Sequence, residues 1–209
     1  MTFPSREEAG QLLGQDLAAR GIKSDVVLGL PRGGVVVAAE AARVLQLPLG
    51  VLVVRKIGHP RHREFAIGAL AEEDVVLLDD EAVRQSQVAQ NELAEVIAEE
   101  TARLRDYKAK FHHPGETTLA GKSVLIIDDG VATGATAVAA VNSAKKQKAR
   151  EVIIAVPVAS PDALERLGRV ADAAFALTAD PDFMAVGQYY DYFPQTSDEE
   201  VLALLQQHA

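Results

Sequence analysis

The sequence of 209 residues contains no cysteine, which excludes disulfides, zinc–thiolate sites and a thiol nucleophile. It also lacks a basic excess, because 21 lysines and arginines stand against 30 aspartates and glutamates, a net charge of −9. Phosphate backbones require a basic surface, so we expect no binding to nucleic acid. A small, locally positive pocket for an anionic metabolite is still allowed.

Long apolar runs are absent as well. No uninterrupted stretch approaches the length of about 18 residues that a membrane-spanning helix requires. The opening residues 1–10 are charged and have no apolar core, which is not typical of a signal peptide. We therefore expect a cytoplasmic protein that does not bind a membrane.

Apolar residues make up 48% of the chain and fall into a repeated strand–helix pattern. Unbroken apolar runs predict strands at 25–30, 49–56, 123–128, 151–159 and 173–177. Helical patterns lie between and around them, at Ser5–Gly21 (with a Ser5–Glu8 capping box), 35–47, 81–111, 135–146, from 161, and 197–207. This alternation predicts an α/β fold with a doubly wound, mainly parallel sheet and helices on both faces.

No repeat or flexible linker divides the chain, so residues 1–209 are expected to form a single domain, with approximately 178–209 as a small hood. The segments 65–70 and 74–79 predict a short antiparallel pair. The basic, Gly- and Pro-containing segment 57–64 before them predicts a mobile loop.

Four polar clusters follow expected strands, and ligands bind beyond the carboxyl ends of the strands in a parallel sheet. The clusters are Pro31–Gly34, Arg55–Lys56, Asp128–Thr136 and the segment 180–192. We expect them to form one site.

The most informative cluster is the stretch VLIIDDGVATGAT at 124–136. Small residues after the carboxylates would let a phosphate approach the backbone N–H groups at a helix N-terminus, and Thr133 and Thr136 add hydroxyl donors. Asp128 and Asp129 need a different partner, for which sugar hydroxyls and Mg²⁺ are the natural candidates. The plainer alternative is an N-capping aspartate pair in an ordinary strand–helix turn.

This stretch resembles the motif of type I phosphoribosyltransferases that binds phosphoribosyl pyrophosphate (PRPP). The resemblance implies that Asp128 and Asp129 bind the ribose hydroxyls. It also implies that the 5-phosphate is bound by the loop residues Ala132, Thr133, Gly134, Ala135 and Thr136.

Weaker likenesses to the same family lie on either side. GLPRGG is similar to the pyrophosphate loop, with Arg32, Gly33 and Gly34 as its binding residues, or else is a simple turn. VRKIGHPRHRE resembles the start of a catalytic loop, in which Arg55 or Lys56 would neutralise the leaving pyrophosphate. Arg61, His62 and Arg63 would then close over it or form a solvated basic loop.

PDFMAVGQYYDYF resembles a segment that covers a purine, with Met184 and Ala185 against the base and Asp191 reaching Mg²⁺; the alternative is an aromatic-rich core segment. One departure matters. The 6-oxopurine enzymes have an aspartate three residues after the acidic pair, and this chain has Ala132.

The resemblance implies Mg²⁺-dependent transfer of a phosphoribosyl group from PRPP to a small nitrogenous acceptor, whose identity the Ala132 departure leaves open. A non-catalytic protein that binds PRPP or a nucleotide on the same fold is the alternative, and hydrolysis of PRPP or a nucleotide is a third possibility. The charged helix expected at 81–111 packs one face on the sheet or lines a homodimer interface.

Overall fold

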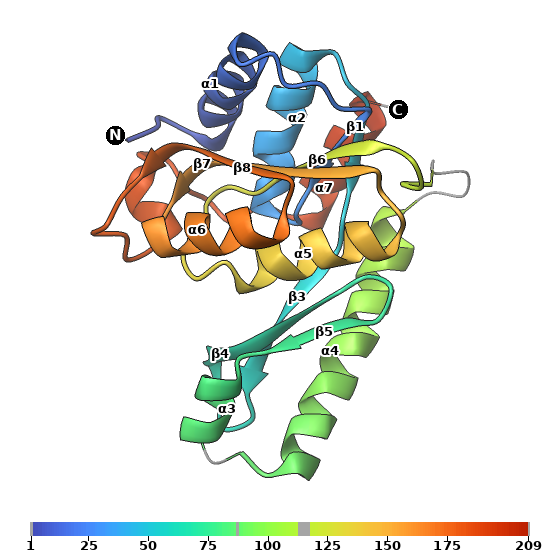
Figure 1. The fold of residues 1–209 in the computed structure, drawn as a ribbon, viewed down its shortest axis with the longest axis vertical. Coiled ribbons are helices and arrows are strands. Elements are labelled where there is room, and N and C mark those ends of the chain that lie inside the picture. Colours follow the sequence, from blue (N-terminus) through green and yellow to red (C-terminus); the bar gives the residue numbers. More distant parts are fainter. Residues whose placement is uncertain (1, 87, 113–117, 209) are drawn as a thin grey trace.

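The computed structural model describes residues 2–86, 88–112 and 118–208. Its centre is a five-stranded, all-parallel sheet in the order β2-β1-β6-β7-β8 (Figure 1). The strands are β1 Val26–Gly29, β2 Leu49–Val51, β6 Ser123–Ile127, β7 Glu151–Ala159 and β8 Ala173–Ala179. The parallel sheet expected from the unbroken apolar runs is confirmed.

Helices cover both faces of this sheet, as expected (Figure 1). Leu125 and Ile127 of β6 pack toward α1 Arg6–Ala19 and α2 Gly33–Leu45. The alternate residues Val124 and Ile126 pack toward α5 Ala135–Lys146 and α6 Pro161–Val170. Successive side chains of a strand face opposite ways, so a strand covered on both sides must be apolar throughout. Burial of each such side chain contributes about 1.5–3 kcal/mol.

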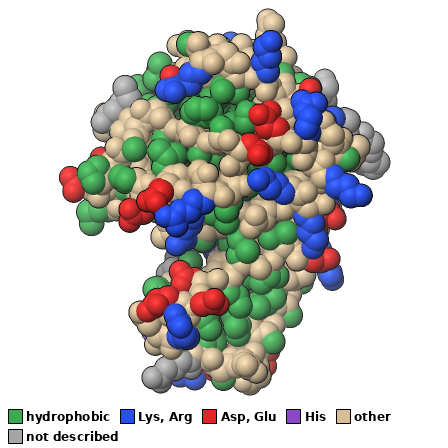
Figure 2. Space-filling model, in the orientation of Figure 1, with side chains coloured by type: hydrophobic (Ala, Val, Ile, Leu, Met, Phe, Trp, Pro, Cys, Tyr) green, Lys and Arg blue, Asp and Glu red, His purple; other side chains and the backbone are tan. Residues whose placement is uncertain are grey.

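A smaller lobe projects from the body below α5 (Figure 1). It holds an antiparallel sheet of β3 Val54–His59, β4 His62–Ala71 and β5 Val75–Leu78, followed by α3 Asp80–Gln85 and α4 Gln90–Phe111. One face of this sheet packs on α4, and the other contacts α5 through small residues such as Ala69 and Ala139. The expected antiparallel pair is β4–β5, and the notch between lobe and body is visible in Figure 2.

Three local expectations were wrong. The single strand expected at 49–56 is divided, because the chain leaves the parallel sheet after β2 and begins the lobe at β3. The segment 57–64, expected to be a mobile loop, forms the tip of the β3–β4 hairpin, in which Ile57 and Ile67 are fully buried against α4. The helix expected at 81–111 is two helices, α3 and α4. The segment HHPGETTLAGK at 112–122, whose proline and glycines predict a break after the helix, lies partly outside the described residues, at 113–117.

The C-terminal part of the chain returns to the body. After the short 3-10 helix η1 Val186–Tyr189, α7 Asp198–Gln207 packs Val201 and Leu205 into the core beside α2. Residues 3 and 4 pair with the tail, where Phe3 N–H donates to Tyr189 O at 2.7 Å. No helix in the described part of the chain is both long and apolar enough to cross a membrane.

Candidate active site

The two adjacent carboxylates lie directly against the glycine loop that begins α2. A Cβ added to Gly33 would be 2.1 Å from Asp129 Oδ2, and one added to Gly34 would be 2.7 Å from Asp128 Oδ1. Only residues without a side chain fit at this distance. The structure therefore brings together two sequence clusters that are about one hundred positions apart, as expected.

The surroundings of both carboxylates disfavour their ionised form. Burial, and then the charge of Asp129, raise the pKa of Asp128 well above its ordinary value. Burial also raises the pKa of Asp129, against the opposing effect of the nearby Arg6 guanidinium. Like charges held together away from water favour protonation, and such arrangements are common at functional sites.

The loop after the carboxylates leads into α5. Gly134 is the N-cap residue with φ of +81°, in the left-handed region where glycine has no Cβ penalty. The loop carbonyls are held from α6 and its cap, since Ser160 Oγ donates to Ala132 O at 2.6 Å and Arg166 Nη1 donates to Thr133 O at 3.2 Å. This arrangement presents the N-terminus of a helix of 12 residues at the carboxyl edge of the sheet.

A cavity of about 750 Å³ lies between this edge and the lobe. Its wall combines predicted residues from three clusters with side chains of the lobe. The lining includes Leu30, Pro31, Val54, Arg55, Lys56, Gly58, Arg63, Glu99, Glu100, Arg103, Asp128 and Thr136. Thus Arg55 and Lys56 line the cavity, although they lie near the start of strand β3, after Val54, and do not end a strand as expected.

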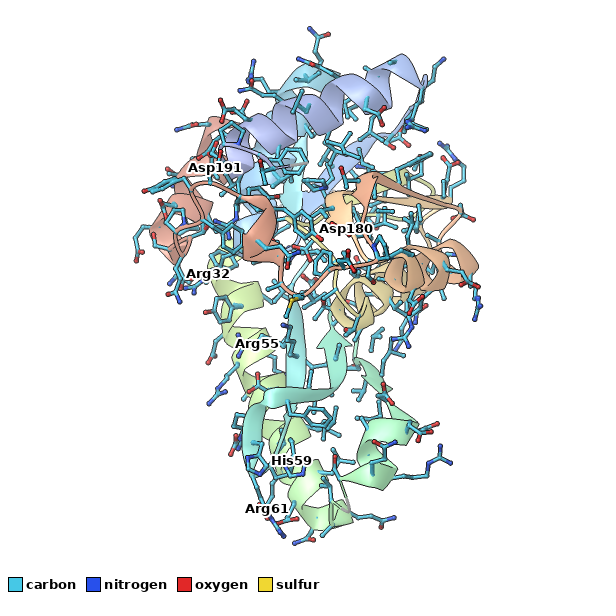
Figure 3. The ribbon with its side chains drawn as sticks, turned by 90° about the vertical axis from the view of Figure 1, so that its left-hand side faces the viewer. Arg32, Arg55, His59, Arg61, Asp180 and Asp191 are labelled. Carbon is cyan, nitrogen blue, oxygen red and sulfur yellow. The ribbon has the colours of Figure 1, made fainter. Side chains whose placement is uncertain are left out.

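The glutamates of α4 were not predicted as site residues, yet they pair with the arginines of the hairpin. Arg55 Nη2 lies 2.8 Å from Glu100 Oε2, and Arg63 Nη2 lies 2.9 Å from Glu99 Oε2. Glu100 is only 5% exposed and also binds Arg103. Arg61 and His59 lie at the far tip of the lobe, away from Arg55 (Figure 3).

Arg32 does not point its charge into this cavity. Its guanidinium pairs with Asp198 of α7, with Nη1 3.4 Å from Oδ1. Arg32 is partly exposed, and Figure 3 shows it on the outer side of the body. The backbone of its loop is therefore better placed for an anion than its side chain. Gly33 and Gly34 lie against the acidic pair, and their binding of pyrophosphate stays a prediction.

A family model described as the phosphoribosyl transferase domain matches residues 6–192. The chain belongs to this family. Two Mycobacterium tuberculosis proteins, from strains CDC 1551 and H37Rv and both named "Putative phosphoribosyl transferase", are 43% identical to it over 204 residues, 97% of this chain. The chain spans about half the length of these two relatives, 46%.

Two solved structures share the fold. The protein TT1426 from Thermus thermophilus is 43% identical, with a TM-score of 0.79 and full coverage of both chains. A purine phosphoribosyltransferase from Pyrococcus horikoshii shares the fold at 19% identity, with a TM-score of 0.51 and coverage of 93% of this chain and 94% of its own.

The segment expected to cover the base carries Met184 and Ala185, and neither residue is in the lining of the cavity. Met184 is 88% exposed. The backbone N–H groups of Met184 and Ala185 both donate to Gln188 Oε1, at 3.1 and 3.0 Å, so the Ala185 N–H is already engaged. The roles of Met184 and Ala185 at the base stay predictions.

The resemblance implies a Mg²⁺ ion, and the carboxylates near the cavity are its candidate ligands. Such ions are typically held by one or two carboxylates, waters and substrate phosphates. Asp128 lines the cavity and fits the part of one such carboxylate. Asp191 is exposed and lies near Phe3, whose carbonyl accepts its backbone N–H. Within residues 2–86, 88–112 and 118–208, no three histidine or carboxylate side chains gather to hold a metal by themselves.

Besides Glu100, sequence reasoning missed a second buried residue of this site, Arg6. It begins α1 and is 8% exposed, and its Nε donates to Asp129 Oδ2 at 2.8 Å. The signal was present, because a cation in the first turn of a helix is disfavoured by the helix dipole unless another partner holds it.

Proposed function

We propose that the protein catalyses Mg²⁺-dependent transfer of a phosphoribosyl group from PRPP to a nitrogenous acceptor, with release of pyrophosphate. The observation that carries the proposal is the close approach of Gly33 to Asp129 and of Gly34 to Asp128, which itself lines the 750 Å³ cavity. A backbone loop for a pyrophosphate and a carboxylate for sugar hydroxyls are needed side by side only where one ligand carries both groups.

In this reaction the bond from ribose C1 to the pyrophosphate oxygen breaks, and a bond from C1 to the acceptor nitrogen forms. The pyrophosphate leaves with the bonding electrons, so the transition state gathers positive charge on the ribose and negative charge on the leaving group. Bound Mg²⁺ would neutralise part of the pyrophosphate charge. The chain's own residues bind and orient the donor, which lowers the barrier by positioning and electrostatic stabilisation.

Each part of the cavity has a corresponding task. The N-terminus of α5, with Thr136, takes the 5-phosphate, and Asp128 accepts hydrogen bonds from the ribose. The N–H groups of the glycine loop take the pyrophosphate. Arg55 and Lys56, on the cavity wall, lie where they can meet the charge that develops as the pyrophosphate departs.

The test is thermal unfolding with PRPP and Mg²⁺, followed by assays with candidate bases. A ligand at about one hundred times its Kd stabilises the folded state by about 2.7 kcal/mol. We expect a clear rise in Tm with PRPP–Mg²⁺, and formation of pyrophosphate only when an acceptor is present. No change in Tm with any phosphorylated ribose would refute the proposal.

A second candidate is a protein that binds PRPP or a nucleotide without turning it over. Two observations favour it: Ala132 replaces the aspartate of the 6-oxopurine enzymes, and Arg55 is already paired with Glu100. Isotope exchange between pyrophosphate and PRPP in the presence of candidate bases separates the two functions, because only a transferase makes and breaks the C1 bond.

A further inference from the structure

The two carboxylates of the motif have different surroundings. Asp128 lines the cavity, whereas the Asp129 carboxylate accepts a hydrogen bond from Arg6 Nε at 2.8 Å. In addition, the backbone N–H of Asp129 donates to Asp128 Oδ1 at 2.9 Å, and the Asp129 carbonyl accepts from the Tyr190 hydroxyl at 2.6 Å. Asp129 is thus held through its side chain and both of its backbone polar groups.

Arg6 itself joins three parts of the site. Besides Asp129, its Nη1 donates to the carbonyl of Pro194 at 2.7 Å, and its guanidinium lies 3.7 Å from the centre of the Phe193 ring. A Cβ on Gly33 would be 2.8 Å from Arg6 Nε, so the same guanidinium also borders the glycine loop. The planar fork of an arginine suits such multiple, fixed contacts, which a lysine ammonium does not reproduce.

These contacts have a geometric consequence for the donor pocket. The carboxylate of Asp129 is fixed between Arg6 and the glycine loop, and this fixes the peptide that joins it to Asp128. Asp128 then presents its carboxylate to the cavity from a rigid backbone, which is what a binding residue requires.

We propose that Arg6 is a positioning residue for donor binding: it acts through Asp129 to orient the glycine loop and Asp128, and Asp128 is the carboxylate that contacts the ribose. This assignment rests on the proposed function, since it concerns how PRPP is held. It divides the acidic pair into one ligand-binding member and one structural member.

The experiment measures the Kd of PRPP–Mg²⁺ by calorimetry at a temperature at which circular dichroism shows each variant folded. The variants are Arg6→Met, Asp129→Asn, their double variant and Asp128→Asn. We expect Arg6→Met and Asp128→Asn each to weaken binding at least about tenfold, the equivalent of 1.4 kcal/mol. Because Arg6 acts through Asp129, Arg6→Met should cause no further loss in the Asp129→Asn background.

Arg20→Met is the matched control. Arg20 follows the same helix, is exposed and pairs with Asp16 at 2.6 Å, so its replacement should leave Kd unchanged. If Arg6→Met does not fold, Arg6→Lys takes its place with the same expectations, since it keeps the charge but loses the fork.

The outcomes are distinct. A folded Arg6 variant with lower Tm but the Kd of the wild type would show a merely structural role and overturn the assignment. Additive losses for Arg6→Met and Asp129→Asn would also overturn it, because they would mean that Arg6 acts independently of Asp129. Failure of the wild type to bind PRPP–Mg²⁺ would instead refute the proposed function.

Discussion

Replacing Gly33 by alanine tests the close packing between the glycine loop and the acidic pair. The new Cβ would lie 2.1 Å from Asp129 Oδ2, about 1.3 Å inside the 3.4 Å at which ordinary van der Waals contact begins. It would also lie 2.8 Å from Arg6 Nε, so the carboxylate cannot retreat without disturbing its own ion pair. No left-handed backbone angle is involved, so the effect is steric.

Two opposing free-energy contributions decide whether Gly33→Ala stabilises or destabilises the protein. Gly33 is the first residue of α2, where alanine would favour the helix by at most about 0.5–1 kcal/mol. Overpacking of a well-packed site costs about 1–3 kcal/mol and should prevail. The net destabilisation is then up to about 2.5 kcal/mol, and in a protein of this size each kcal/mol lowers Tm by about 2–4 °C, so we expect a fall of up to about 10 °C.

The assay is thermal unfolding monitored by circular dichroism, together with PRPP–Mg²⁺ binding, which we expect to weaken at least about tenfold. Gly168→Ala is the control, because Gly168 lies within α6 and nothing is within 4 Å of the added Cβ. That change should raise Tm slightly. If Gly33→Ala behaved like the control, with unchanged PRPP binding, the close contact between loop and carboxylate would be refuted.

Three further predictions follow from charges. Burial and a neighbouring carboxylate raise the pKa of Asp128, so this carboxyl opposes folding increasingly as pH rises from its unfolded-state pKa to its folded-state pKa; Asp128→Asn should raise the Tm of the free protein at pH 7 while weakening PRPP binding at least about tenfold. Glu72 is 2% exposed and, although burial opposes it, hydrogen bonds from His112 and the Val53 N–H hold its pKa below the usual range. The stability that ionised Glu72 contributes is therefore present above its unfolded-state pKa and is lost as pH falls through its folded-state pKa. Glu72→Gln should thus lower the free energy of unfolding at pH 7 by roughly 1–3 kcal/mol and flatten the acid limb of the Tm–pH curve. Glu100→Gln should lower Tm and tighten pyrophosphate binding, because it frees Arg55 from a competing anion.

Each of these has a clear contrary result. If Asp128→Asn were less stable than the wild type at pH 7, the ligand-free folded protein would have to stabilise the charged Asp128 carboxylate. If the acid limb of the Tm–pH curve were unaltered in Glu72→Gln, the lowered pKa of Glu72 would not be a source of the acid sensitivity. Pyrophosphate affinity that falls in Glu100→Gln would mean that the glutamate positions Arg55 for the leaving group and does not compete with it. Glu95, which is exposed on the same helix and does not line the cavity, offers a control for the last case.

The central sheet and the loop after β6 were predictable because they depend on local information. Four branched apolar residues before Asp128 specify a strand buried on both faces, and the small residues after it specify a tight entry into α5. That the cluster Pro31–Gly34 lies beside the acidic pair was predictable from one topological rule, that the carboxyl ends of parallel strands share an edge.

What was missed depends on contacts between distant segments. The basic segment 57–64 was expected to be a loop because of its polar, Gly- and Pro-containing composition. Its strand pairing is stabilised by the distant helix α4, whose glutamates also pair with the arginines of the hairpin. Arg6 was read only as part of a helix start, since its partner Asp129 is 123 positions away. Side chains such as Arg32 and Met184 have exposed positions that sequence patterns do not determine.

The pairing of residues 3–6 with residues 189–194 has a consequence in time. Arg6 meets Pro194 across 188 positions, and contacts that close such long loops form only after the intervening chain is ordered. We therefore expect this closure to be among the later steps of folding, so that in a refolding experiment most of the helix and strand signal recovers before PRPP binding does.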